Sequence, residues 1–236
     1  MGTWTLDELA RLVDHTNLHA DATEADMDRL CEEAVRHHFR MVAINQVQVR
    51  HCARRLAGTD VHVGAAIAFP LGQTSIDAKV FETRDALANG ATEIDYVVNL
   101  TRVRQHDWYY VEEEMHRIVD ACNEANVPSK VIFENCYLSD EEKIALCRIA
   151  RKVRPTFVKT STGFGSGGAT VSDVALMHAN VGNEVLVKAA GGIRDADTFL
   201  DMVRAGARRI GTSAGVPIIE ELSRRLATLP HQAIEL

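Results

Sequence analysis

The sequence predicts an α/β fold, a closed (β/α)8 TIM barrel with a short N-terminal helix. Eight short apolar segments rich in β-branched residues recur along the 236 residues, with amphipathic stretches between them. Their starts lie 21 to 37 residues apart, which leaves room for a helix and two loops each time. Such repetition requires parallel strands with right-handed crossovers, and eight units suit a closed barrel.

The elements are expected in a regular order. The strands are residues 12–17, 41–45, 62–69, 93–99, 130–135, 157–162, 185–190 and 208–213. Helix starts are indicated where a Ser or Thr is followed three residues later by an acid, as at Thr5/Glu8, Thr23/Asp26, Ser139/Glu142 and Thr170/Asp173. Periodicity alone leaves an open doubly wound sheet as the alternative. Because no Pro-rich linker, low-complexity tract or charge block divides the chain, we expect one domain over residues 1–236.

The composition excludes several classes of partner. The chain has 26 Lys and Arg against 33 Asp and Glu, and a net charge of −7 argues against nucleic acid. No stretch approaches the roughly 18 consecutive apolar residues of a membrane span, and acids stand where a signal peptide would be basic and apolar. The five cysteines form no Cys-x-x-Cys pair, which is typical of reduced thiols. We therefore expect a cytoplasmic protein without a membrane partner.

Several charged side chains are expected inside the barrel. Residues at i and i+2 of a strand share a face, and this alternation directs inward Asp14, Thr16, Asp95, Glu134, Lys159 and Lys188. One interpretation is a buried ion-pair network without chemistry. Two inward lysines on neighbouring strands favour catalysis instead, because their repulsion makes one amine lose its proton more readily. A neutral amine attacks carbonyls, so the pattern predicts Schiff-base chemistry at the carboxyl ends of the strands.

The other lysines and the strand histidines fit structural roles. Lys79, Lys143 and Lys152 fall in helix-like segments and Lys130 at a strand entrance, so surface salt bridges are expected for all four. A metal-dependent barrel aldolase would need convergent histidine ligands. Only His15 and His62 fall within strands, and isolated strand histidines are mostly hydrogen-bonded structural residues. No metal site is expected.

Glycine-rich loops follow the last three predicted strands, at residues 163–168, 191–192 and 211–215. Each precedes a helical segment, and backbone N–H groups in glycine turns and at helix starts form anion sites. In barrels the phosphate site commonly lies after strands seven and eight. Together with the hydroxyl of Ser213, the loops favour a phosphorylated carbonyl substrate.

Six motifs lie on the predicted strands and the loops after them. They are Asp14-His15-Thr16, Phe69-Pro70-Leu71-Gly72, Glu93-Ile94-Asp95, Val158-Lys159-Thr160-Ser161-Thr162-Gly163, Val187-Lys188-Ala189-Ala190-Gly191-Gly192 and Arg209-Ile210-Gly211-Thr212-Ser213. Spread from about Leu12 to Ile219, they resemble the deoxyribose-phosphate aldolase family. The departures from patterns common in that family are His19, Ala43, Gln46, Ala214 and a C-terminus without tyrosine, and they concern substrate selection, phosphate affinity and proton relay.

The resemblance implies a class I aldolase without metal or cofactor. Such an enzyme reversibly cleaves 2-deoxy-D-ribose 5-phosphate to acetaldehyde and D-glyceraldehyde 3-phosphate, in deoxynucleoside catabolism. Lys159 would form the Schiff base, Lys188 would lower its pKa and Asp95 would transfer protons. Substrate and phosphate would contact Thr16, Gly163, Gly191, Gly192, Gly211 and Ser213.

The resemblance also implies partners and leaves alternatives open. The partners would be small sugar phosphates and aldehydes, and the chain would form a homo-oligomer, a dimer or a tetramer. One alternative is another Schiff-base aldolase acting on a related sugar phosphate. The other is a non-catalytic sugar-phosphate-binding barrel, which would keep the glycine loops but would not need two inward lysines.

Overall fold

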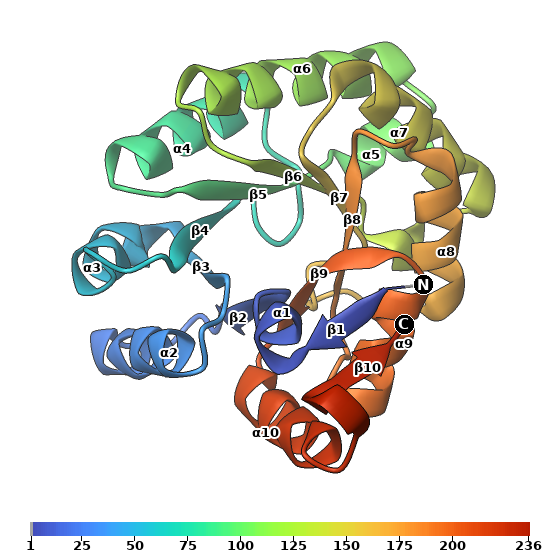
Figure 1. The fold of residues 1–236 in the computed structure, drawn as a ribbon. Coiled ribbons are helices and arrows are strands. Elements are labelled where there is room, and N and C mark those ends of the chain that lie inside the picture. Colours follow the sequence, from blue (N-terminus) through green and yellow to red (C-terminus); the bar gives the residue numbers. More distant parts are fainter. Residues whose placement is uncertain (1) are drawn as a thin grey trace.

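The computed structural model describes residues 2–236, which fold around a closed barrel of parallel strands (Figure 1). Strands β2 to β9 follow the barrel in chain order, and β9 closes it by pairing with β2. Their bounds are β2 (Val13–Asn17), β3 (Met41–Asn45), β4 (His62–Ile67), β5 (Glu93–Val97), β6 (Ser129–Ile132), β7 (Phe157–Lys159), β8 (Leu186–Ala190) and β9 (Ala207–Thr212). The predicted (β/α)8 barrel is confirmed, and the open sheet is wrong.

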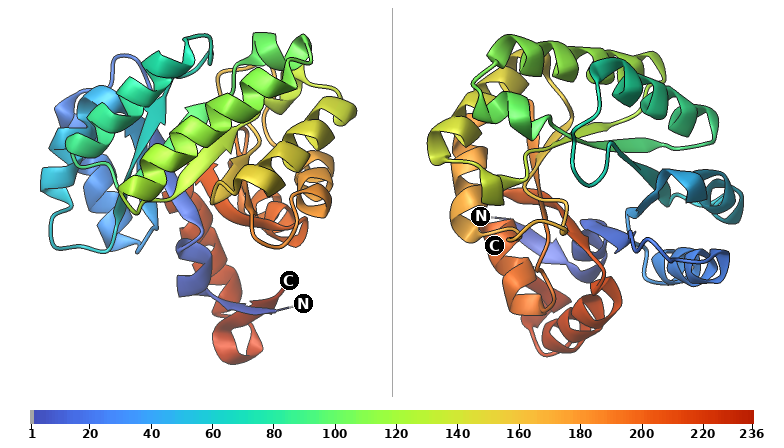
Figure 2. Two further views of the ribbon diagram at one scale, coloured as in Figure 1. Left: turned by 90° about the horizontal axis from the view of Figure 1, so that it is seen from above. Right: turned by 180° about the vertical axis from the view of Figure 1, so that it is seen from behind.

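Helices surround the barrel and cover its strands (Figures 1 and 2). They are α1 (Leu6–Ala10), α2 (Glu24–Arg36), α3 (Val49–Arg55), α4 (Ile76–Ala88), α5 (Leu100–Arg104), α6 (Trp108–Glu124), α7 (Asp140–Val153), α8 (Val171–Asn180), α9 (Ala196–Arg204) and α10 (Gly215–Leu226). Short 3-10 turns occur at η1 (Gln46–Gln48), η2 (Asn135–Tyr137) and η3 (Pro230–Gln232). The expected N-terminal helix is α1.

The predicted helix starts are observed. Thr5, Thr23 and Ser139 each form a complete capping box, in which the hydroxyl accepts from the N3 amide and the N3 acid accepts from the cap amide. Thr170 forms half of the pattern, because its hydroxyl accepts from the Asp173 amide at 3.1 Å. These caps satisfy amides that the first helical turn leaves unpaired.

A second, two-stranded sheet joins the two ends of the chain. Strand β1 (Thr3–Thr5) pairs antiparallel with β10 (Ala233–Glu235), and the pair projects from one end of the barrel (Figure 2). We did not predict this sheet. Each strand has only three residues, and its partner is at the other end of the sequence, so no local pattern reveals the pairing.

The strands alternate between an apolar outer face and a polar inner face. On β5, Ile94 and Tyr96 belong to the hydrophobic core, whereas Glu93 and Asp95 lie on the opposite face. Within residues 2–236, every helix is too short or too polar to cross a lipid bilayer. The five cysteines are free thiols.

Candidate active site

The strand register brings the two inward lysines together. Lys159 on β7 is the register partner of Lys188 on β8, and parallel neighbours in register share a face of the sheet. In the same way Asp95 on β5 is the partner of Lys130 on β6. All four side chains are at least 95% buried in the barrel interior. Side chains that are 29 or more residues apart in sequence thus form one cluster of charges.

Asp95 is the centre of this cluster. Its Oδ2 accepts hydrogen bonds from Lys159 Nζ at 2.9 Å and Lys188 Nζ at 2.7 Å. Its Oδ1 accepts from Lys130 Nζ at 2.7 Å. Burial opposes ionisation of Asp95, but the three ammonium groups hold its pKa well below the usual range. The carboxylate is therefore charged at neutral pH and touches both lysines that the sequence singles out.

The surroundings of Lys159 make its proton easier to remove than that of an ordinary lysine. Burial lowers its pKa, the Asp95 carboxylate opposes that effect, and the positive charges of Lys188 and Lys130 lower it further, to about 8. A substantial fraction of the amine is then neutral just above neutral pH. This is the condition that nucleophilic attack on a carbonyl requires.

Three of the four lysines assigned to the surface are buried, so that prediction is wrong for them. Lys130 is fully buried inside the barrel, and Lys79 is fully buried on α4, where it donates to Glu114 at 2.6 Å. Lys143 is 7% exposed and contacts Asp173. Only Lys152 makes an exposed salt bridge, with Glu112. The period of two contained the signal for Lys130, because a strand that directs Glu134 inward directs Lys130 inward as well.

Sequence reasoning also missed two charged side chains deeper in the barrel. Arg209 on β9 donates to Glu93 at 2.9 Å and to Asp14 at 2.8 Å. Glu93 also contacts Lys130. The same alternation could have located them, since Glu93 shares a face with Asp95 and Arg209 shares one with Gly211.

A cavity of about 270 Å³ opens at the carboxyl ends of the strands, above the charge cluster. Its lining contains Lys159 and every residue predicted to contact substrate or phosphate, namely Thr16, Gly163, Gly191, Gly192, Gly211 and Ser213. His19, one of the departures from the family pattern, also lines it, as do Phe164 and Arg194, which the sequence analysis did not name. Asp95 and Lys188 are not in the lining; Asp95 contacts the cavity residue Lys159, and Lys188 contacts Asp95.

Three glycines allow close packing at the cavity. Gly191 has φ +87°, and the Cβ of a residue at Gly168 would lie 2.2 Å from its carbonyl oxygen, so the two backbones can meet only without side chains. At Gly211 a Cβ would lie 3.0 Å from Ala190 Cβ and 3.3 Å from Lys188 Cε. A larger residue at position 211 would therefore displace the second lysine.

Helix α10 begins close to Ser213 of the cavity lining, and among residues 2–236 no side chain caps its first turn. The N-cap of α10 is Ala214, which has no side chain to accept from the amides of that turn, and its own amide donates to Thr212 Oγ1 at 2.9 Å. Unpaired amides at a helix start, with the positive end of the helix dipole, bind anions. The neighbouring Ser213 lines the cavity, so an anion there lies within reach of this helix start.

Glu134 lies inside the barrel, as predicted, but it contacts a loop and not the lysines. Its carboxyl group accepts from the Thr162 amide at 3.2 Å and contacts the Thr162 hydroxyl. Burial raises the pKa of Glu134, although the bonds from Thr162 oppose the effect. Glu134 thus fastens the loop that follows the Schiff-base candidate Lys159.

The strand histidines make the expected hydrogen bonds. His15 Nε2 lies 2.7 Å from Glu33, and His62 Nδ1 lies 2.6 Å from Glu93. Among residues 2–236, no three His, Cys, Asp or Glu side chains are grouped as a metal site would need.

Comparison with known proteins gives the family. Residues 9–219 match the family model described as DeoC/LacD family aldolase. A deoxyribose-phosphate aldolase of Lactobacillus acidophilus is 60% identical over 99% of this chain and 98% of its own length. One of Bacteroides thetaiotaomicron is 51% identical over 92% of this chain and 91% of its own. The tetrameric deoxyribose-phosphate aldolase structure from Aeropyrum pernix superposes with a TM-score of 0.86, at 31% identity and 92% coverage of both chains. The chain belongs to the DeoC/LacD family of aldolases.

Proposed function

We propose that this aldolase reversibly cleaves 2-deoxy-D-ribose 5-phosphate to acetaldehyde and D-glyceraldehyde 3-phosphate through a Schiff base on Lys159. The observation that carries the proposal is the Lys159 amine in the cavity wall, 2.9 Å from Asp95, with Lys188 on the same carboxylate oxygen. The relatives at 60% and 51% identity bear the name of this reaction.

The first half of the reaction joins the enzyme to the sugar. The neutral amine of Lys159 attacks the aldehyde carbon C1 and forms a carbinolamine. Asp95 Oδ2 accepts hydrogen bonds from both this amine and Lys188, so the Lys188 ammonium can supply, through Asp95, the proton that lets water leave and an iminium form. The positive nitrogen then accepts the electron pair of the C2–C3 bond, and the C3 hydroxyl loses its proton and becomes the aldehyde of glyceraldehyde 3-phosphate.

The second half releases the two-carbon product. The enamine on Lys159 takes a proton at C2 and returns to an iminium. Water adds to that iminium, acetaldehyde leaves, and the amine of Lys159 is free again. Carbinolamine formation and imine hydrolysis both occur at C1, next to the Lys159 nitrogen, so Asp95 and Lys188 can serve both halves with one geometry.

The phosphate end of the substrate occupies the glycine-lined side of the cavity. Backbone amides around Gly191, Gly192 and Ser213, with the first turn of α10, would bind its oxygens. Arg194 lines the same cavity and would add a positive charge. Gly163, Gly211 and Thr16 complete the substrate contacts.

The chain acts in the cytoplasm as a homo-oligomer, a dimer or a tetramer. The Aeropyrum pernix relative is described as tetrameric, and the five thiols here are free, as suits a reducing compartment. Light scattering after gel filtration measures the mass directly. A mass of one 26.0 kDa chain at micromolar concentration would contradict the oligomer.

Reductive trapping tests the Schiff base. Borohydride added with acetaldehyde should attach two carbons to Lys159, as peptide mass spectrometry reads it, and Lys159→Ala should abolish both the adduct and cleavage. Lys152→Ala, at an exposed lysine, is the matched control. An adduct on any other residue would overturn the assignment. A coupled assay measures the glyceraldehyde 3-phosphate released from 2-deoxy-D-ribose 5-phosphate. A non-catalytic binding barrel, or an aldolase specific for another sugar phosphate, would release none from this substrate.

A further inference from the structure

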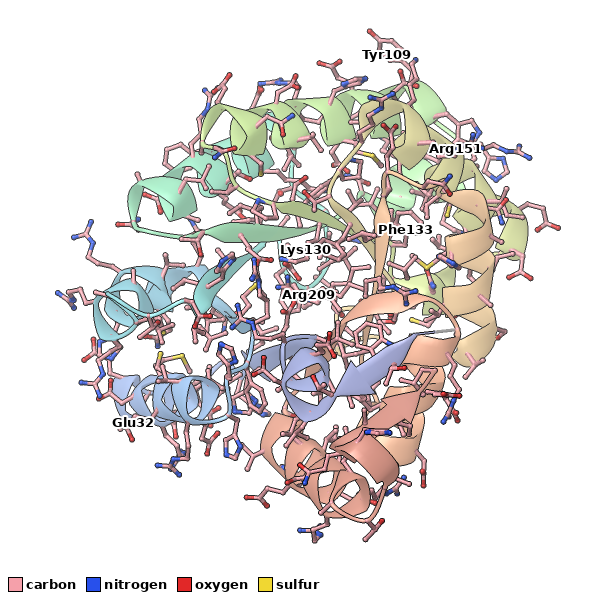
Figure 3. All side chains as sticks on the ribbon, viewed as in Figure 1. Glu32, Tyr109, Lys130, Phe133, Arg151 and Arg209 are labelled. Atoms are coloured by element: carbon pink, nitrogen blue, oxygen red, sulfur yellow. The ribbon has the colours of Figure 1, made fainter. Side chains whose placement is uncertain are left out.

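Six charged side chains form a closed ring inside the barrel, with acids and bases in alternation. We call this set the charge ring, and its members in order are Asp95, Lys130, Glu93, Arg209, Asp14 and Lys188. Lys130 and Arg209 lie side by side near the barrel centre (Figure 3). The members of the charge ring come from strands in both halves of the chain, between β2 and β9.

Every step of the charge ring is a direct contact. Lys130 bridges Asp95, at 2.7 Å, and Glu93. Arg209 Nη2 bridges Glu93 Oε2, at 2.9 Å, and Asp14 Oδ1, at 2.6 Å. Lys188 closes the ring with Asp14 at 2.5 Å and Asp95 at 2.7 Å. The Asp14–Lys188 contact is an ion pair whose angles do not suit a hydrogen bond.

The charge ring is electrically complete without Lys159. Its three acids and three bases cancel, and none of the six is more than 6% exposed, so solvent screens them little. Among the described residues, Asp95 is the one acid that pairs with Lys159, and its Oδ2 is already bound to Lys188 and its Oδ1 to Lys130. Lys159 is therefore the seventh group, and its proton is the one positive charge that no acid of the ring balances.

We propose that Glu93, Lys130 and Arg209, none of which lines the cavity, are positioning residues whose charge balance decides how readily the Lys159 amine becomes free to attack substrate. The proposal rests on the assignment of Lys159 as the Schiff-base residue. It gives a reaction role to side chains on the inner part of the barrel that the substrate never touches.

The proton affinities around the ring agree with this geometry. Burial opposes the charge of Glu93, but Lys130 and Arg209 hold its pKa well below the usual range. Burial also opposes the charge of Lys130, but Asp95 and Glu93 raise its pKa above the usual value. Glu93 and Lys130 therefore keep their charges at neutral pH, whereas the pKa of Lys159 is lowered to about 8.

The groups that face the Lys159 amine come from every neighbouring element. Asp95 on β5, Lys130 on β6 and Lys188 on β8 act on it directly, and Glu134 after β6 acts more weakly. His19 and Arg194 line the cavity on the other side. The test leaves Asp95, the acid that pairs with Lys159, unchanged.

Two substitutions of opposite sign test the charge balance. The rate of adduct formation at Lys159 rises with pH as its amine loses a proton, and the pH of this rise is called the acid limb. Glu93→Gln removes a negative charge and should move the acid limb about one pH unit lower. Lys130→Met removes a positive charge and should move the acid limb about one pH unit higher. The double variant restores neutrality, so its limb should return to that of the unchanged protein. The readout is the rate of borohydride-trapped acetaldehyde adduct at Lys159 from pH 7 to pH 10, with kcat/KM measured alongside.

Controls separate charge from packing. Lys79→Met with Glu114→Gln removes another fully buried ion pair, on the outer side of the barrel wall, and should leave the limb in place. Asp14→Asn and Arg209→Met repeat the two charge changes elsewhere in the ring. They must move the limb in the same directions, so the test remains available if one of the first variants does not fold.

The outcomes distinguish the two proposals. An adduct absent from Lys159 in the unchanged protein overturns both the Schiff-base assignment and the role of the ring. An adduct at Lys159 with coincident limbs in all variants overturns only the role of the ring. Shifts of the same sign in the two single variants, or a double variant that sums their losses, would show that these residues serve packing alone.

Discussion

The six lysines have the same side chain, and their positions decide which of them can act as the nucleophile and which can lower its pKa. Lys159 and Lys188 share one carboxylate oxygen of Asp95, whereas Lys152 is paired at the surface with Glu112. An arginine could not replace Lys159, because a guanidinium stays protonated and cannot form an imine. The chemistry thus depends on a residue whose charge the surroundings can remove.

Lys188→Met should reduce catalysis in a pH-dependent way. Removing the positive charge of Lys188 raises the pKa of Lys159, so less of the amine is neutral at pH 7, and kcat/KM there should fall at least about tenfold. Part of the loss should be recovered at pH 9, where the amine of Lys159 deprotonates again. Steady-state assays across this range measure it, with Lys152→Met as control. An equal loss at every pH would contradict the electrostatic role, leaving only proton transfer.

At the scale of elements, the residue at which a helix begins sets the length of the loop before it, and helix α7 shows this. Helix α7 begins after Ser139, whose hydroxyl accepts from the Glu142 amide, while the Glu142 carboxylate accepts from the Ser139 amide. Both residues were recognisable in the sequence because the capping box is local. The loop before α7 carries Glu134, which fastens Thr162.

Ser139→Ala should destabilise the fold by about 1 kcal/mol, the usual cost of losing an N-cap, without changing kcat. Urea unfolding followed by circular dichroism measures the change. Ser223→Ala, at an exposed position inside α10, is the matched control and should stay within about 0.5 kcal/mol. Equal stability of the two variants would show that the cap contributes nothing.

At the scale of the whole molecule, the barrel interior is held together by charge as well as by apolar packing. The charge ring connects strands β2, β5, β6, β8 and β9 through side chains that are almost fully buried. Breaking such a network leaves uncompensated buried charge, which costs far more than an exposed pair. Stability should therefore depend on keeping the acids of the ring ionised.

Acid should unfold the protein through these carboxylates. Asp95 and Glu93 have pKa values well below their ordinary 3.8 and 4.5, so their stabilisation is complete above about pH 5 and is lost as the pH falls. The two together should lower the free energy of unfolding by about 3 kcal/mol between pH 5 and pH 3. Urea unfolding at several pH values measures it. Glu93→Gln should lose only about 1 kcal/mol over the same range, and a loss equal to that of the unchanged protein would contradict the assignment.

The sequence by itself determined the barrel and the direction of its strands. Recurring β-branched segments, helix caps and the period of two are local patterns, so they predicted the eight barrel strands, α1 and the inward faces of Asp95, Lys159 and Lys188. Their errors were also local. Lys130 was placed at the surface because a strand entrance is commonly exposed, although the alternation that placed Glu134 inside applied to Lys130 too.

Only the tertiary structure decided which charges meet. The sheet β1–β10 and the contacts of Arg209 with Asp14 and Glu93 join residues that are more than 100 positions apart, and no local pattern specifies such pairs. Closing the barrel brings these side chains into one buried interior, where each charged group must find a partner or become neutral. The sequence supplied seven such groups, and the closure of the barrel left Lys159 as the one without an acid of its own.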